Sequence, residues 1–157
     1  MDKLKDAKAV YKTLCQTLDN MKWRYNKEED RLIIRTAAVG DDLTMNLFFC
    51  VDADRQVMYL KSPMPFPIPA SMHNTMAKAI LLANYYMLNG SFEFDYSDGY
   101  LAFKIVVPFM ESIISEAVCK YMIIVACNMT DKFNDKFQDV ATGRMTIEAF
   151  EAFVNNG

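Results

Sequence analysis

The pattern of apolar and polar positions is clearest between residues 74 and 109. An apolar run covers residues 79–88 and is interrupted by one polar residue, Asn84, which predicts a buried helix. Asn84 would then need hydrogen-bond partners inside the fold. Asn89-Gly90 follows the run, and a glycine at such a place commonly adopts the left-handed conformation that ends a helix. We therefore expect the helix to stop at Gly90.

The next segment alternates aromatic and acidic residues, as a strand with one buried face does. These residues are Phe92, Glu93, Phe94, Asp95 and Tyr96. Asp98-Gly99 fits the two positive-φ positions of a type I′ turn, so a second strand should return from Tyr100. That loop sets four pairs opposite one another: Phe92 with Ile105, Phe94 with Phe103, Tyr96 with Leu101, and Glu93 with Lys104. Because apolar and oppositely charged pairs agree on one alignment, the pattern predicts a β-hairpin.

The N-terminal part predicts one helix followed by a meander of strands. Apolar residues at three- and four-residue spacing indicate an amphipathic helix from Asp2 to about Met21. The β-forming segments after it are residues 23–25 as a short edge strand, then 31–39, 43–51 and 57–60. Gly40-Asp41-Asp42 supplies the turn between the two longest strands.

Helical spacing returns after Ser112 and continues to Thr142-Gly143, where we expect a long helix to break. Ser112 or Ser115 caps its start, and Thr146 begins a short last helix. The predicted fold class is α+β, with an antiparallel sheet of about five strands in α-βββ-α-ββ-α-α order and helices packed on the sheet. We expect one domain over residues 1–157, in which residues 130–157 form a helical C-terminal extension.

A proline-rich segment separates the meander from the apolar helix, with Pro63, Pro65, Pro67 and Pro69 at alternate positions. Proline at this spacing excludes a helix or a central strand and favours an extended path, and Ser71 could cap the helix that follows. The gaps hold Met64, Phe66 and Ile68, which are too apolar for a solvated linker. Their cover could be the core, a second copy of the chain or a client peptide, and we expect a client peptide.

The composition excludes several classes of protein. The 157 residues are 52% hydrophobic and 24% charged, which fits a folded cytoplasmic domain without membrane insertion. The net charge is −3, and no stretch concentrates lysine and arginine among aromatic residues, so nucleic acid is not an expected partner. The twelve methionines suit an irregular core or an adaptable binding surface.

Candidate chemistry is sparse. His73 is the one histidine, and near a helix start we expect it to be solvated or capping rather than catalytic. The four cysteines have no metal-binding spacing, so we expect buried thiols. The acidic clusters lack the ligand pattern of a calcium loop, and no glycine-rich phosphate loop is present. We therefore expect no catalytic residue, no metal and no cofactor.

The order of elements, together with a set of hairpin residues, resembles a known family. The residues that carry the resemblance are Asn84, Gly90, Phe92, the Asp98-Gly99 turn and Phe103. The chain is similar, from about Met21 to Val125, to the YbjN-like bacterial proteins that are labelled sensory transduction regulators. That resemblance implies the fold of the small type III secretion chaperones and a homodimer that binds proteins without catalysis. It implies no catalytic residues, and it leaves residues 130–157 outside the pattern.

We accordingly expect a non-enzymatic protein-interaction module, a regulator or chaperone-like adaptor with a protein partner. The alternative is a sensor domain that binds a small molecule in a pocket between sheet and helices.

Overall fold

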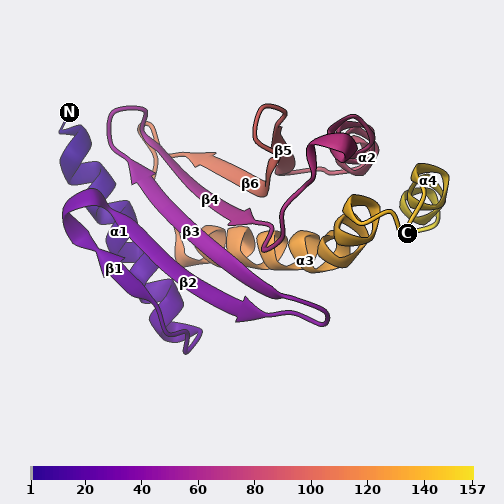
Figure 1. Ribbon diagram of the computed structural model, residues 1–157. Helices are drawn as coiled ribbons and strands as arrows, with labels where there is room; N and C mark the ends of the chain where they lie inside the picture. The colour runs from indigo at the N-terminus through magenta and orange to yellow at the C-terminus, as the bar shows by residue number, and fades with distance from the viewer. Residues whose placement is uncertain (1) are drawn as a thin grey trace.

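The computed structural model describes residues 2–157 and shows an α+β fold with an open antiparallel sheet of six strands and four helices (Figure 1). The elements are α1 (Lys3–Asn20), β1 (Asn26–Glu28), β2 (Ile33–Val39), β3 (Thr44–Asp52), β4 (Val57–Pro63), α2 (His73–Tyr85), β5 (Ser91–Asp95), β6 (Tyr100–Pro108), α3 (Glu116–Ala141) and α4 (Ile147–Asn156). Short 3-10 turns lie at Glu29–Arg31 and Ala70–Met72. The predicted fold class is confirmed, and the short edge strand lies a few residues later than expected, at β1.

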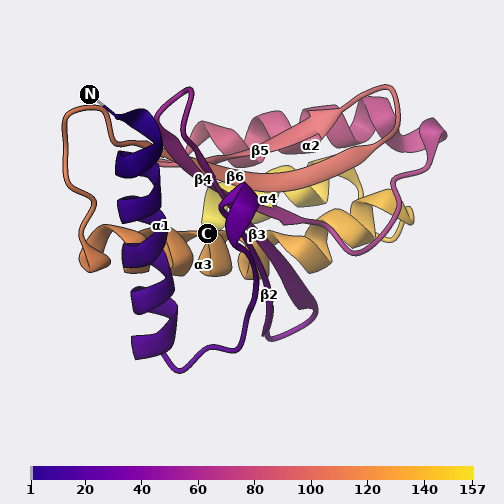
Figure 2. The ribbon, with the colours of Figure 1, turned by 90° about the vertical axis from the view of Figure 1, so that its left-hand side faces the viewer.

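The strands lie in the order β1-β2-β3-β4-β6-β5, so the last hairpin joins β4 through its second strand and leaves β5 at the edge. Helices α1 and α3 pack against each other over one face of the sheet, and Figure 2 shows α1 crossing α3. Helix α2 lies beside the edge strand β5, and α4 contacts both α2 and α3. The elements that precede and follow the hairpin therefore meet at one end of the molecule.

Alternation along the strands separates a buried face from an open one. In β3 the side chains of Met45, Leu47, Phe49 and Val51 are buried beneath the helices. The intervening residues lie on the open face, where Phe48 packs against Tyr59 with ring centroids 6.3 Å apart. One sheet face thus supplies the core, as the period-two pattern of an antiparallel strand requires.

The hairpin forms, but its expected register is wrong by two residues. Phe92 lies opposite Phe103 and Asp95 opposite Tyr100, so the loop covers Tyr96 to Gly99 instead of Asp98-Gly99 alone. The backbone N–H of Gly99 donates to the Asp95 carbonyl at 2.8 Å, and of the two expected turn residues only Gly99 has a positive φ, 79°. A shift of two residues leaves each side chain on the same face, which is why the apolar pattern fitted both alignments.

Glu93 keeps its charged partners despite the new register. Its carboxylate lies 2.9 Å from Lys104 Nζ and 2.7 Å from Lys61 Nζ on β4. Burial raises the pKa of Glu93, but hydrogen bonds from the two lysines outweigh it, so the pKa lies below its ordinary value. The open face therefore carries a charged triad that joins three strands.

The expected end of the apolar helix is also wrong. Helix α2 stops at Tyr85, and Tyr86 caps it without a left-handed residue. Gly90 does have a positive φ of 80°, but its role is close packing, because a Cβ there would lie 2.4 Å from the Phe103 ring. Ser71 is not the N-cap either, since it lies within the 3-10 turn and the helix begins at His73.

The two C-terminal helices begin and end where predicted. Ser115 Oγ accepts from the Val118 N–H at the start of α3, and Thr146 Oγ1 accepts from the Ala149 N–H at the start of α4. Between them Gly143 has a φ of 76°, which ends α3. The break predicted at Thr142-Gly143 is confirmed.

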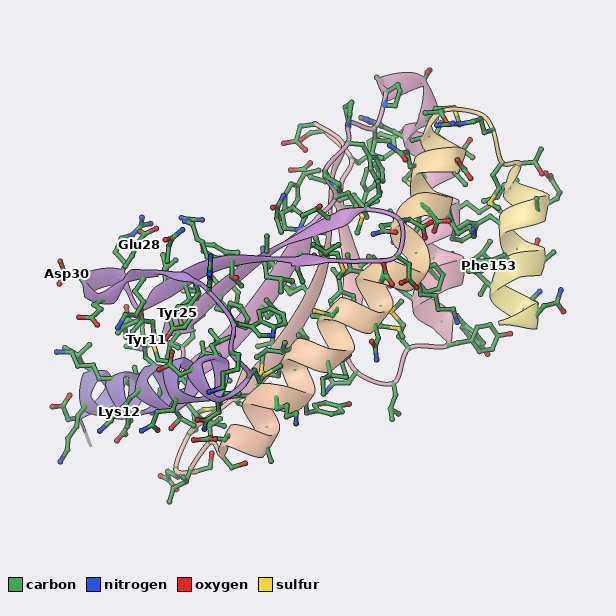
Figure 3. All side chains as sticks on the ribbon, turned by 90° about the horizontal axis from the view of Figure 1, so that it is seen from below. Tyr11, Lys12, Tyr25, Glu28, Asp30 and Phe153 are labelled. Carbon is green, nitrogen blue, oxygen red and sulfur yellow. The ribbon has the colours of Figure 1, made fainter. Side chains whose placement is uncertain are left out.

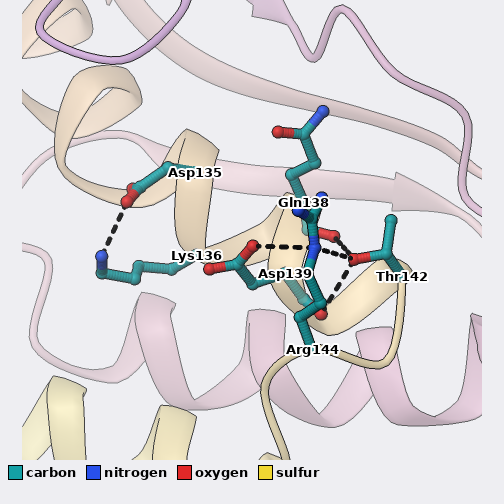
Figure 4. A network of polar contacts seen from close by, with 6 residues as sticks. All are labelled: Asp135, Lys136, Gln138, Asp139, Thr142 and Arg144. Carbon is teal, nitrogen blue, oxygen red and sulfur yellow. Dashed lines mark hydrogen bonds and ion pairs between the residues drawn. The ribbon is translucent and has the colours of Figure 1, made fainter.

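Polar contacts hold the link between α3 and α4 in a tight turn (Figure 4). Thr142 Oγ1 donates to the Gln138 carbonyl at 2.9 Å, and Arg144 Nε donates to Thr142 Oγ1 at 3.1 Å. The same guanidinium lies 3.5 Å from Asp139 Oδ1. Because the turn is closed in this way, α4 folds back onto α2 and α3.

The two ends of the molecule are held by different chemistry (Figure 3). Near β1, the hydroxyl of Tyr11 donates to the Ile33 carbonyl at 3.1 Å and that of Tyr25 to Asp19 Oδ1 at 2.8 Å. At the opposite end Phe153 joins a group of packed phenylalanine rings from β5, α3 and α4. Burial raises the pKa of Tyr11 to about 12, so its hydroxyl remains a donor at neutral pH.

Candidate protein-binding surface

The proline segment follows β4 without a sharp break. The N–H of Met64 donates to the Leu101 carbonyl at 2.8 Å, so one ladder bond extends past the end of the strand. Ile68 is 6% exposed and belongs to the core, whereas Met64 and Phe66 are half-buried and pack against it. A partner-binding role for these three residues stays a prediction.

His73 fixes the path of this segment, and the expectation of a solvated or capping histidine is wrong. The ring is 7% exposed, with Nδ1 2.9 Å from the Tyr96 carbonyl oxygen and Nε2 3.0 Å from that of Ile68. The rings of Phe94 and Tyr96 meet its faces edge-on. Carbonyl oxygens only accept, so both contacts are hydrogen bonds when each ring nitrogen carries a proton. One side chain thus joins α2, the hairpin loop and the proline segment.

The hairpin loop is shaped to receive this ring. Gly99 is buried, and a Cβ on it would lie 2.8 Å from His73 Nε2 and 2.8 Å from the Ile68 carbonyl oxygen. Asp98 Oδ1 accepts from the Tyr100 N–H at 2.8 Å and closes the loop. The turn residues that carried the family resemblance therefore have a packing role.

Asn84 closes the edge of the sheet. Its Nδ2 donates to the Phe92 carbonyl at 3.0 Å, and its Oδ1 accepts from the Phe92 N–H at 2.8 Å. The amide occupies the place of a neighbouring strand's peptide group, which satisfies the edge and prevents another strand from pairing there. Phe92 itself packs on Phe103 with centroids 5.4 Å apart. The hydrogen-bond partners that the sequence required for Asn84 are present.

A groove between α2, α3 and α4 is a feature that the sequence analysis did not predict. We call it the α2–α3 groove, and it has a volume of about 520 Å³. It is lined by Ala83, Tyr86, Met87, Leu88, Asn89, Tyr121, Val125, Asn128, Met129, Lys132, Phe133, Val154, Asn155 and Gly157. Its rim holds large apolar side chains in solvent: Leu88 is 100% exposed, Tyr86 66% and Tyr121 45%.

The sequence held a signal for an exposed apolar face at the start of α3, to which Tyr121 of the groove belongs. Ile113, Ala117, Tyr121 and Ile124 recur at helical spacing and are all exposed, whereas Cys119, Met122, Ile123 and Ala126 on the same stretch face the core. The start of α3 is therefore apolar on both sides. A helix of this kind needs cover on two faces, and the sheet supplies one of them.

The groove carries little charge. Among its lining side chains in residues 2–157, Lys132 is the one formal charge. Its Nζ lies 5.4 Å from the centroid of the Phe133 ring and beside Gly157, and no Asp or Glu side chain in residues 2–157 pairs with it. The groove is thus apolar with one cationic end.

The described residues offer few groups for nucleophilic or metal chemistry. Burial raises the pKa of Cys119 and of Cys127 to about 11 each, so both thiols stay protonated at neutral pH. Across residues 2–157, no group of three or more His, Cys, Asp or Glu side chains is arranged to hold a metal ion. No helix in the same range is long and apolar enough to cross a membrane.

Comparisons with known proteins place the fold. No protein-family model and no curated protein sequence matches the chain. Its structure is similar to that of YbjN from E. coli, a candidate transcription regulator, with a TM-score of 0.59 and 10% identity over 84% of this chain and 92% of that one. The ExsC–ExsE complex gives a TM-score of 0.57 and 8% identity over 80% of this chain and 91% of the matched one. The fold resemblance expected from the sequence is confirmed.

Proposed function

We propose that this chain is a non-catalytic protein-interaction module that binds a partner protein through the α2–α3 groove. The observation that carries the proposal is the set of exposed apolar side chains, Leu88, Tyr86 and Tyr121, at the rim of an apolar groove. Apolar patches of this kind on a folded protein mark sites that another molecule covers. Tyr121 comes from α3, and Tyr86 and Leu88 come from the short segment that joins α2 to β5, so the groove is built between elements of the folded core.

The structural neighbours support the class of function. One of them is described as a complex of two proteins and the other as a candidate regulator. At 8–10% identity the likeness covers the fold alone, so the partner is not carried over. A regulator or adaptor role fits both neighbours, and a homodimer is part of the proposal.

The test is capture of a partner that depends on the groove. Purified chain immobilised on beads should recover a protein from an extract of the native host, and the recovered protein, once purified, should bind the chain in titration calorimetry. The double variant Leu88→Ser with Tyr121→Ser should lose this binding, since both side chains lie at the rim. Ile113→Ser is the control, because Ile113 is 96% exposed but lies outside the groove.

A protein that binds both variants as well as the native chain would contradict the use of this groove. Size-exclusion chromatography with light scattering tests the homodimer separately. A monomer mass for the native chain would refute the homodimer and would leave the proposal of a partner protein unaffected.

The groove volume also supports the second candidate, a small-molecule sensor, since ligand pockets commonly measure about 300–1,000 Å³. A thermal-shift screen against metabolites tests it, because a ligand at about 100 times its dissociation constant adds about 2.7 kcal/mol of stability. A metabolite that raises the melting temperature of the native chain but not that of the variant Leu88→Ser with Tyr121→Ser would favour the sensor function.

A further inference from the structure

We infer that the occupant of the α2–α3 groove is an amphipathic helix of the partner protein with acidic residues on its polar side, a conclusion that rests on the proposed function. The first support is that this side of the molecule already binds one such helix, the chain's own α4. Phe150 and Val154 of α4 are buried, and Phe153 packs edge-on against Phe133 with centroids 5.8 Å apart. Its exposed face holds Glu148 and Glu151.

The groove continues beside α4. Val154 and Asn155 of α4 form one wall, the segment after α2 forms the second, and α3 forms the third. On α3 the lining begins at Tyr121 and ends at Phe133, about 18 Å along the helix axis at 1.5 Å per residue. A partner helix of about 12 residues would cover that length. The open part of the groove is therefore a second helix-binding site of the kind that α4 occupies.

Hydrogen bonding selects a helix over an extended peptide. The walls come largely from α3 and α4, whose backbone groups bond within their own helices, and the third wall, residues 86–89, lies between α2 and β5 and is not a strand, so among the lining residues no strand edge faces the groove. An extended peptide buried there would leave its N–H and C=O groups unpaired, whereas a helix satisfies its own. Helix-in-groove binding is the recognition mode that such walls permit.

The positive charge of Lys132 favours a partner with acidic side chains at this place. Lys132 lies in the groove wall without an Asp or Glu partner in residues 2–157, so an acidic residue on the partner would gain a pair that a basic one would lose. A symmetric dimer in which the two grooves face each other does not meet this need, because the second groove brings another Lys132 and no acidic side chain. An acidic helix from a different protein fits both the shape and the charge.

The test uses a synthetic peptide of about 18 residues, long enough to be helical when bound, with Leu and Phe on one face and Glu on the other. Fluorescence anisotropy with the full chain should show saturable binding of this peptide, and circular dichroism should show a gain of helix. A matched peptide with Lys in place of Glu should bind about tenfold more weakly. Lys132→Glu should reverse that preference, whereas Lys120→Glu, an exposed lysine of α3 outside the groove, should leave it unchanged.

The rim double variant, Leu88→Ser with Tyr121→Ser, should bind the acidic peptide about tenfold or more weakly than the native chain does. Thermal unfolding of the variant should stay cooperative. Absence of saturable binding to the native chain would overturn the inference, and so would equal binding of both peptides or a preference unaffected by Lys132→Glu. A host protein lost by the double variant together with no binding of the acidic peptide would uphold the proposed function and refute the helical acidic ligand.

Discussion

Replacing Gly99 by alanine should disturb three elements at once. Gly99 has a φ of 79°, a conformation that costs a residue with a Cβ about 1–2 kcal/mol. The new Cβ would also lie 2.8 Å from His73 Nε2 and 2.8 Å from the Ile68 carbonyl oxygen. Neither neighbour can move freely, since the ring is held from its other side by the Tyr96 carbonyl.

The magnitude follows from these two parts. If the imidazole shifts, the hydrogen bond that its N–H donates to one of the two carbonyl oxygens is lost, which contributes about 0.5–1.5 kcal/mol. Together with the backbone cost, Gly99→Ala should lower the free energy of unfolding by about 1.5–3.5 kcal/mol. Urea denaturation of the full chain, followed by circular dichroism, measures this loss as a shift in the unfolding midpoint.

Gly143→Ala is the matched control. Gly143 has nearly the same φ, 76°, but nothing lies within 4 Å of the position that its Cβ would take. The backbone cost and the effect of alanine on the unfolded chain are common to both variants. The difference between them, about 0.5–1.5 kcal/mol, therefore reports the contact with His73 and Ile68.

Equal losses in the two variants would refute the reasoning. A second check is the double variant with His73→Ala, in which the ring is already absent. Adding Gly99→Ala to His73→Ala should cost at least about 0.5 kcal/mol less than adding it to the native chain.

Three further predictions concern other contacts. In urea titrations, Glu93→Gln should destabilise the protein at pH 7 but much less near pH 3. The pKa of Glu93 is lowered in the folded chain, so its carboxylate stabilises the fold at pH values above the ordinary pKa of glutamate. That contribution is lost as the pH falls through the folded-state pKa. Asn84→Ala should cost about 1–3 kcal/mol by leaving backbone groups of β5 unpaired, and faster amide exchange at this edge should accompany it. Ile68→Ser should lower the free energy of unfolding by about 2–5 kcal/mol, whereas the double variant Met64→Ser with Phe66→Ser should lower it by about 1 kcal/mol. If the proline segment contacts the partner, the double variant should stay folded and capture less of it.

Local sequence patterns determined most of the elements. β-forming composition predicted β3 and β4, alternation and the turn residues predicted the hairpin strands, and helical spacing with Ser115 and Thr146 as caps predicted α3 and α4. These features depend on residues close together in the chain, so the sequence alone contains them. It also contained the need of Asn84 for partners, although not their identity.

Features that join distant segments were decided by the tertiary structure. The apolar pattern fitted two hairpin registers, and the observed one places Gly99 against the Ile68 carbonyl and the His73 ring, which come from outside the hairpin. Helical spacing predicted α3 but not which of its apolar residues are covered; the sheet covers one side of the helix, and α4 contacts part of the rest. The α2–α3 groove is what remains open, and its walls come from residues 83–89, 121–133 and 154–157, whose proximity no local pattern encodes.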